Sequence, residues 1–406
     1  MRAVATKRWT PVTAFALLAF AGCSETGSAK SYGFLTTLGR DTISAERVSR
    51  TADTVRIESV DRFPRVRLRH TTVVLAPDKS VRRVTMDIRT PSAPVAKDRQ
   101  RRVVADISRD SLIVTVSDRG GTLTGRFPTD GELTLPHVSQ LYSIGELYLN
   151  AALAKGLRDR IRAGDSVTVL QFYPDDNLDH FRMHSGWVQP LKGDSVELWH
   201  GLISGVGFAM VDSAGRLLSY SGAQSTYKVE VKRLSVPPDV NSIAASLTAN
   251  EQRIGPSQLS VRDTVRATVG TAQLLIDYSR PLTRGRKLLG NVIDIDAVWR
   301  TGANAATQLF TTAPITLGTL KLAPGGYTLW TIPHAAGAEL IVSKETGQWG
   351  TEYDPPHDLG RTPLTVEAAA DTVEKFTISV TLGKAKSGTL RMAWGTFRWS
   401  VEIRGR

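Results

Sequence analysis

Hydrophobic and polar residues alternate with a period of two along most of this chain, which is the pattern of β-strands buried on one face. The stretch 226–234 has the clearest alternation, because Val229 and Val231 fall on one face while Glu230 and Lys232 fall on the other. Similar stretches precede it and are separated by turn-forming Pro, Asp and Gly residues. Short strands joined by tight turns predict an antiparallel sheet. The predicted strands are 41–50, 54–60, 65–75, 81–90, 102–108, 111–117, 122–127, 166–172, 182–189, 195–203, 207–211 and 217–221.

One helix is predicted within this series. Leu141 and Ile144 begin a run of apolar residues at helical spacing, and Gly164 follows the run as a C-cap. Pro136 is expected near the start of the helix, where its missing N–H costs nothing. Because a large sheet curls around what it buries, residues 34–235 predict a curled, half-barrel-like antiparallel sheet with one helix. This architecture is similar to that of periplasmic lipoprotein carriers. The helix either fills the concave face or leaves a cavity there for a hydrophobic ligand.

Residues 236–256 are predicted to link two domains, because Pro237 and Pro238 end the last strand and a short helix fits 240–253. The second domain, 257–406, returns to the period of two. Its many short strands, without convincing helices, predict a β-sandwich of jelly-roll type. Between the first and the last strand of this domain, the predicted strands are 297–300, 308–311, 319–322, 327–332, 339–343, 376–380 and 389–394.

The N-terminus has positive charges, then an apolar run at 12–20, and then the sequence Phe-Ala-Gly-Cys, which ends at Cys23. This pattern is similar to a bacterial lipoprotein signal peptide at 1–23, and it predicts lipidation of Cys23 followed by a polar tether at 24–33. An ordinary secretory signal or a membrane helix is the alternative, but the run is shorter than the roughly 20 residues that span a bilayer. The predicted location is the cell envelope, and Ser24 favours the outer membrane, facing the periplasm or the exterior.

Composition narrows the class of protein. The length of 406 residues suits two domains, and 41% hydrophobic with 22% charged residues is typical of a folded chain. The net charge of +12 comes from basic residues scattered through the predicted strands, and no nucleic-acid-binding motif is present. The expected partner is therefore an anionic envelope and not a nucleic acid. With one cysteine, an internal disulfide is impossible.

The second domain contains a series of motifs in a recognisable order and spacing. They are YSRP at 278–281, RGR at 284–286, VWRTGAN at 298–304, APGGYTLWTIP at 323–333, Lys344, Trp349-Gly350 with Tyr353, and Trp394. Over roughly 259–403 the chain thereby resembles the bacterial domain-of-unknown-function family 2911. The resemblance implies a fold and an envelope or secreted location, and it implies no activity.

These motifs suggest one ligand site. Arginine with aromatic and amide side chains suits a carboxylate, phosphate or sugar. The alternative is architectural: Trp299 and Trp330 pack the core, glycines serve turns, and Asn304 hydrogen-bonds backbone at a corner. The candidate ligand-binding residues are Arg300, Asn304, Lys344, Trp349 and Tyr353.

No catalytic residue, metal site or cofactor is predicted. His180 and His184 are four residues apart, but their surroundings favour a turn entering a strand, and no H-E-x-x-H motif is present. His357 stands isolated in a predicted exposed loop, and no Gly-x-Ser-x-Gly elbow is found. The expected function is a non-catalytic binding or interaction module for a glycan, a lipid or an envelope protein. The alternatives are a lipid carrier acting through the first domain and a hydrolase of envelope polymers.

Overall fold

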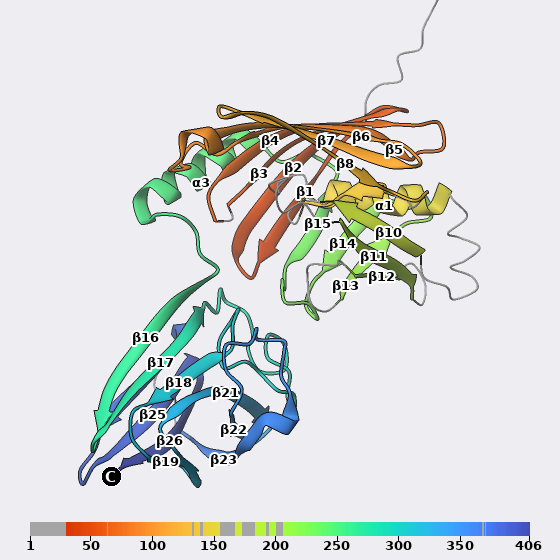
Figure 1. Ribbon diagram of the computed structural model, residues 1–406. Helices are drawn as coiled ribbons and strands as arrows, with labels where there is room; N and C mark the ends of the chain where they lie inside the picture. Colours follow the sequence, from red (N-terminus) through yellow and green to blue (C-terminus); the bar gives the residue numbers. More distant parts are fainter. Residues whose placement is uncertain are drawn as a thin grey trace, which may run out of the picture.

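The computed structural model describes residues 30–406, except 63, 132–133, 139–140, 155–166, 173–182, 192–194, 200–205, 368 and 370. Within this part of the chain, one sheet of 15 strands and one of 11 strands form two domains (Figure 1). The predicted mainly β class is confirmed, as is the curled N-terminal sheet with its helix. None of the described helices is long and apolar enough to cross a bilayer.

The N-terminal sheet grows outward from its first strand. β1 lies between β2 and β15, so that strands β2 to β8 extend to one edge and strands β15 to β9 extend to the other. Neighbours pair antiparallel except β9 and β10, which are parallel. Most strand boundaries lie within two residues of those that alternation predicts. The strands are β1 (Lys30–Leu38), β2 (Asp41–Arg50), β3 (Thr54–Asp61), β4 (Arg67–Leu75), β5 (Val81–Arg89), β6 (Gln100–Ile107), β7 (Ser111–Asp118), β8 (Gly121–Pro128), β9 (Thr134–Pro136), β10 (Val167–Phe172), β11 (Met183–Pro190), β12 (Ser195–Trp199), β13 (Gly207–Val211), β14 (Leu217–Ser221) and β15 (Glu230–Leu234).

Two N-terminal predictions are revised. β1 begins at Lys30, inside the stretch 24–33 that was expected to be tether, because Lys30 pairs with Arg50 and the strand continues along β2. Pro136 lies in β9 and not at the start of a helix. Since β9 is an edge strand, a residue that lacks an N–H donor is tolerated there.

The helix α1 (Tyr142–Ala154) packs into the core of the curled sheet. Ile144 and Leu147 are buried in the same hydrophobic cluster as side chains from both halves of the sheet. Among the described residues, α1 therefore occupies the concave face. The predicted continuation of the helix to the Gly164 C-cap lies outside the described residues.

A carboxylate from the sheet binds the first turn of α1. Glu46 of β2 is fully buried, and it accepts hydrogen bonds from the backbone N–H groups of Tyr142 (2.7 Å) and Ser143 (3.1 Å) and from the Ser143 hydroxyl. These N–H groups have no partner within the helix. Burial raises the pKa of Glu46 to about 7, although the hydrogen bonds from Ser143 and Tyr142 act in the opposite direction.

The predicted linker 236–256 contains the helix α3 (Val240–Ile254), and it also covers part of the N-terminal sheet. Asp239 caps the helix by accepting from two backbone N–H groups of the first turn, each at 3.1 Å. Val240 and Ala244 are buried against β2 and β3 in a cluster separate from the one that holds α1. The segment therefore stabilises the first domain as well as joining it to the second.

The C-terminal sheet folds over its own core. From β16 the order runs through β17, β18, β21, β22, β23 and β26, with β25 and β24 continuing on one side of β26 and β19 and β20 on the other. A bridge between Leu282 and Lys375 joins the end of β17 to β24, so the expected sandwich takes the form of one nearly closed, barrel-like sheet. The strands are β16 (Ser260–Val269), β17 (Ala272–Pro281), β18 (Thr307–Thr311), β19 (Ile315–Leu317), β20 (Leu320–Leu322), β21 (Gly325–His334), β22 (Gly337–Ser343), β23 (Asp358–Val366), β24 (Val373–Leu382), β25 (Ser387–Gly395) and β26 (Phe397–Gly405).

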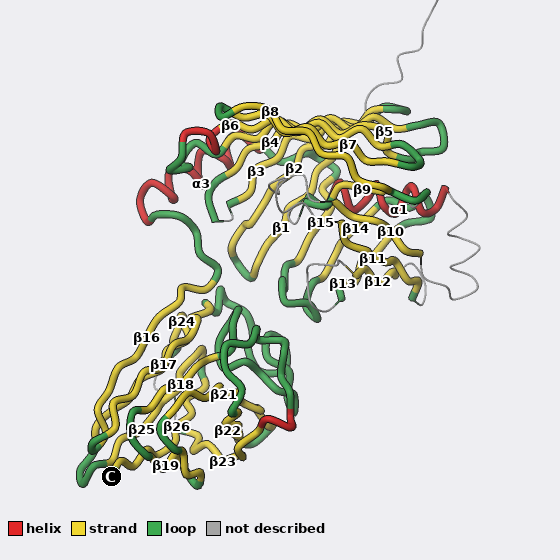
Figure 2. The backbone as a smooth tube through the Cα atoms, viewed as in Figure 1, coloured by secondary structure: helices red, strands yellow, loops and turns green. Residues whose placement is uncertain are grey.

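A small polar joint connects the two domains. The backbone N–H of Arg40, in the turn between β1 and β2, donates to the carbonyl of Arg284 (3.0 Å), and the Arg284 guanidinium pairs with Asp41. Gly39 has φ 59°, and a Cβ there would lie 2.3 Å from the Arg284 carbonyl oxygen, so only glycine fits this approach. Arg40 also pairs with Glu374 of β24 at 3.2 Å. The loops of the C-terminal domain gather toward this joint (Figure 2).

Candidate functional site: a cationic cleft between the domains

A cleft of about 330 Å³ lies between the two domains, beside the joint. This volume is at the lower end of the range of small-molecule sites. The N-terminal domain contributes Leu38 and the segment 226–228, and the C-terminal domain contributes the rest. The C-terminal lining residues that matter below are Arg284, Arg286, Trp299, Arg300, Gly302, Ala303, Asn304, Trp349 and Trp394.

The backbone around Arg300 is held in place on both sides. Trp299 and Thr331 exchange two backbone hydrogen bonds (2.7 and 2.9 Å), which fasten the loop to β21. Thr301 then adopts φ 52°, and its buried hydroxyl bonds the Thr331 hydroxyl at 2.6 Å. A Cβ on Gly350 would lie 2.3 Å from the Arg300 Cδ, so the arginine stem passes directly over this glycine. These contacts fix the backbone on both sides of Arg300 and thereby hold its guanidinium in the cleft.

Asn304 and Trp349 occupy neighbouring backbone positions. Asn304 has φ 59°, a conformation that asparagine tolerates better than most residues. Its carbonyl accepts from the Gly350 N–H at 3.0 Å and from the Arg300 guanidinium at 3.4 Å. Trp349 forms an antiparallel bridge with Ala305, next to Asn304, and its side chain is 47% exposed at the rim of the cleft. Asn304 therefore contacts Gly350 and Arg300 through its backbone carbonyl, and it also lines the cleft.

A buried polar network that sequence reasoning missed supports this rim. The side chain of Gln308 accepts from the Gly347 N–H (3.1 Å) and donates to the Thr328 hydroxyl (2.9 Å). The Thr328 hydroxyl in turn donates to the carbonyl of Glu345 (2.7 Å) and bonds the side chain of Gln348 (2.9 Å). Gln308 and Thr328 are polar residues in buried strand positions, and this break in the pattern is the signal that marks such a network.

Three cations in the cleft have no carboxylate partner within the part of the chain that the structure describes. Lys228 donates to the Ala223 carbonyl (2.7 Å), Arg286 donates to two backbone carbonyls (2.9 and 3.0 Å), and the only bond of Arg300 is the long one to Asn304. Burial lowers the pKa of all three, to about 10 for Arg286. After burial, the largest influence on the pKa of Lys228 is Asp294, which raises it, whereas Arg300 and Arg286 lower it. The two arginines are therefore close enough to repel Lys228.

Arg284 differs from these three because it forms an ion pair with Asp41, a carboxylate that it shares with Arg62. Gathering partly buried cations without a counter-ion is unfavourable, since each loses hydration and repels the others. A bound anion would remove that penalty. The lining residues include no aspartate or glutamate, so the described walls of the cleft have one sign of charge.

The tryptophans divide into core and rim. Trp299 stacks on Trp394 at a centroid distance of 6.0 Å and an interplanar angle of 12°, and Phe376 packs edge-on against both. Trp394 is fully buried, and its indole N–H donates to the Glu374 carbonyl at 3.3 Å. These residues form the apolar floor of the cleft, whereas Trp349 is free to contact a ligand.

The structure brings together three of the five candidate ligand residues, Arg300, Asn304 and Trp349. Tyr353 lies elsewhere: its ring packs against buried Trp330 at 5.3 Å, and its hydroxyl donates to Asp358 at 2.6 Å. Lys344 is exposed, and its backbone N–H bonds the His357 carbonyl (2.9 Å). Lys344 follows the end of strand β22 at Ser343 and is not among the residues that line the cleft.

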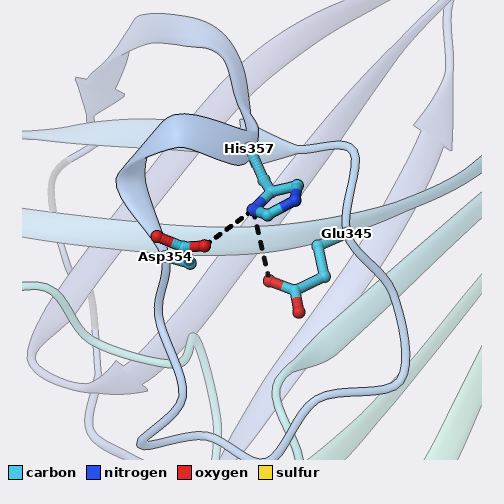
Figure 3. Close-up of side chains that lie close together, drawn as sticks. All are labelled: Glu345, Asp354 and His357. Atoms are coloured by element: carbon cyan, nitrogen blue, oxygen red, sulfur yellow. Dashed lines mark hydrogen bonds and ion pairs between the residues drawn. The ribbon is translucent and has the colours of Figure 1, made fainter.

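Close to Lys344, three titratable side chains meet at the surface (Figure 3). His357 Nδ1 lies 2.9 Å from a carboxylate oxygen of Asp354 and 3.9 Å from one of Glu345. Their ligand atoms lie within 4.8 Å of one another, as a metal ion would require. All three are solvent-accessible, in keeping with the exposed loop predicted for 354–357. Of the two histidines considered for zinc, His184 lies in β11, and His180 lies outside the described residues.

The fold and the cleft together define a two-domain, mainly β protein whose cleft between the domains is lined by basic and aromatic side chains. Residues 260–403 match the family described as "Protein of unknown function (DUF2911)", which confirms the resemblance of the C-terminal domain. Among curated proteins, none matches the chain. A DUF1089 family protein of Pseudomonas aeruginosa has 13% identity and a TM-score of 0.33, with 45% of this chain and 91% of that chain covered. A β-barrel-like DUF1849 protein of Brucella abortus has 13% identity and a TM-score of 0.32, with 51% and 94% covered.

Proposed function

We propose that this protein is a non-catalytic binding protein of the bacterial cell envelope, anchored by lipid on Cys23. Its ligand is an envelope molecule whose anionic group is held in the cleft between the domains. The observation that carries this proposal is the set of three cations, Lys228, Arg286 and Arg300, which form no ion pair with any described carboxylate. Asp294 attracts Lys228, and Glu374 and Asp41 attract Arg286, without forming an ion pair with either cation. An anionic ligand would replace the missing counter-ion, and the exposed ring of Trp349 would cover an apolar or flat part of it.

Binding is favoured over hydrolysis because of what lines the cleft. A glycosidase-type reaction needs a pair of carboxylates on either side of the scissile bond. The described lining contains neither a carboxylate nor a histidine. Cationic and aromatic groups there suit recognition of an acidic glycan or of a lipid head group.

Anion binding can be measured directly by tryptophan fluorescence. Inorganic phosphate and glucuronate are titrated into the detergent-solubilised protein, with neutral glucose as the comparison. At least one anion is expected to change the fluorescence with saturation, since Trp349 lies at the rim. Arg300→Gln should weaken binding about tenfold or more, because charge-assisted hydrogen bonds contribute about 1.5–3 kcal/mol.

Arg266→Gln is the matched control. Arg266 is exposed on β16, toward the hairpin end that lies away from the cleft, and the same charge is removed. The proposal is wrong if neither anion binds, or if the control variant loses as much affinity as Arg300→Gln.

A further inference from the structure

We infer that the anionic group held by the cleft is a phosphoryl group. This inference rests on the proposed function and makes it more specific, since it selects among carboxylate, phosphate and neutral sugar ligands.

The charge of the cleft exceeds what a carboxylate can neutralise. Lys228, Arg286 and Arg300 form no ion pair with a described carboxylate, and Arg284 beside them is already paired with Asp41. Asp294 attracts Lys228, and Glu374 and Asp41 attract Arg286, but none of these carboxylates lines the cleft. One carboxylate carries a single negative charge and would leave two cations unbalanced. A phosphate monoester carries about −1.5 to −2 at neutral pH, which matches three cations more closely.

The donors of the cleft also exceed the capacity of a carboxylate. Arg300 makes only one long bond, so most of its five N–H donors are unused. On the same loop, the backbone N–H groups of Gly302, Ala303 and Asn304 have no acceptor among the described residues. Loop N–H groups combined with guanidinium donors are a common way to bind phosphate oxygens. A phosphoryl group presents three or four oxygens to such a set, whereas a carboxylate presents two.

The size of the site limits what else of the ligand can enter. A cleft of about 330 Å³ holds the phosphoryl group together with a short polar portion such as a glycerol or a single sugar. The rest of the ligand would extend past Trp349 into solvent. Two envelope sources carry such a group. A terminal phosphate monoester on a glycan meets both the charge and the donor arguments, whereas the phosphodiester of a lipid head group carries one negative charge and meets only the donor argument.

The test compares three soluble probes by calorimetric titration of the solubilised protein. Glycerol 3-phosphate represents a terminal phosphate, glycerophosphoglycerol represents a lipid head group, and glucuronate represents a carboxylate sugar. One of the two phosphates is expected to bind at least about tenfold more tightly than glucuronate. Tighter binding of the monoester supports a terminal phosphate as the source, and tighter binding of the diester supports a lipid head group.

The variants separate a phosphoryl site from general electrostatic attraction. Arg286→Gln and Arg300→Gln are each expected to reduce phosphate affinity about tenfold or more, whereas Arg266→Gln should not change it. Thermal unfolding of each variant checks that it is folded. If glucuronate binds as tightly as the tighter-binding of the two phosphates, the phosphoryl inference is overturned while the anion-binding function stands. If none of the three probes binds, both are overturned.

Discussion

The docking of α1 by Glu46 leads to a prediction about stability and pH. The Glu46 carboxyl is fully buried, and burial raises its pKa from the ordinary 4.5 to about 7. The folded protein therefore holds a proton on Glu46 more tightly than the unfolded chain does. Between these two values the folded state has more bound protons than the unfolded state, so the free energy of unfolding decreases as pH rises. This stabilising contribution is fully present below pH 4.5 and is lost by about pH 7.

The size of the effect follows from the same two values. Each pH unit between them corresponds to about 1.4 kcal/mol, so the whole interval corresponds to about 3 kcal/mol. Glu46→Gln removes the titration while keeping the size of the side chain. The variant has its own cost, because an amide NH₂ replaces one of the two acceptor oxygens at Ser143, but this cost does not vary with pH.

The assay is the urea dependence of hydrogen exchange in the peptide that contains α1, measured at several pH values from 4.5 to 8. Taking the difference between wild type and Glu46→Gln cancels the other titrating groups. The wild type should lose about 3 kcal/mol relative to the variant across this range. A difference that stays constant, or a wild type that gains stability as pH rises, would refute the reasoning and would mean that the hydrogen bonds to the ionised carboxylate outweigh its desolvation.

The anchor, the cleft and the domain joint each lead to one further expectation. Cys23→Ser should remove the protein from the membrane fraction and abolish incorporation of a labelled fatty acid, and label that persists would contradict the lipid anchor. Gly350→Ala should weaken phosphate affinity in calorimetric titration about tenfold, because the new methyl group would lie 2.3 Å from the Arg300 Cδ and displace the guanidinium; unchanged affinity would show that the position of Arg300 does not matter. Asp41→Asn should lower the free energy of unfolding in urea by about 1–3 kcal/mol, since Arg284 loses its carboxylate. The same variant should bind phosphate more tightly, because Arg284 then becomes a further unpaired cation in the cleft, and weaker binding would contradict the electrostatic argument.

Much of the N-terminal domain is readable from its pattern. Strands such as 207–211 and 217–221 have the boundaries that alternation predicts, because a period of two is a local property of a strand with one buried face. Strand β1 was not predicted, because its apolar residues adjoin small polar ones. Its place in the sheet depends on pairing with β15, which is far away in the sequence. The prediction that Pro136 begins a helix was wrong for a similar reason. The sequence around it fits a helix start, but the parallel pairing with Phe172 places it in a strand.

Only part of the candidate site could be predicted from the sequence. Arg300, Asn304 and Trp349 lie in two motifs that a short bridge holds together, so their proximity is consistent with the order of the motifs. Tyr353 belongs to the second of those motifs, yet it packs against Trp330 outside the cleft. Lys228 could not have been chosen from the sequence, because it belongs to the other domain and lines the cleft only when the two domains are in contact.

The sequence by itself determined the period of the strands, the two-domain division of the chain, the family resemblance of the second domain and the residue types available for binding. Only the tertiary structure decided which of those residues meet. Alternation specifies which face of a strand a side chain occupies, but it contains no information about strand partners or about how one sheet stands against another. The three cations come from the turn between β14 and β15 in one domain and from the loop between β17 and β18 in the other, and their shared charge arises only when both sheets have closed around their cores.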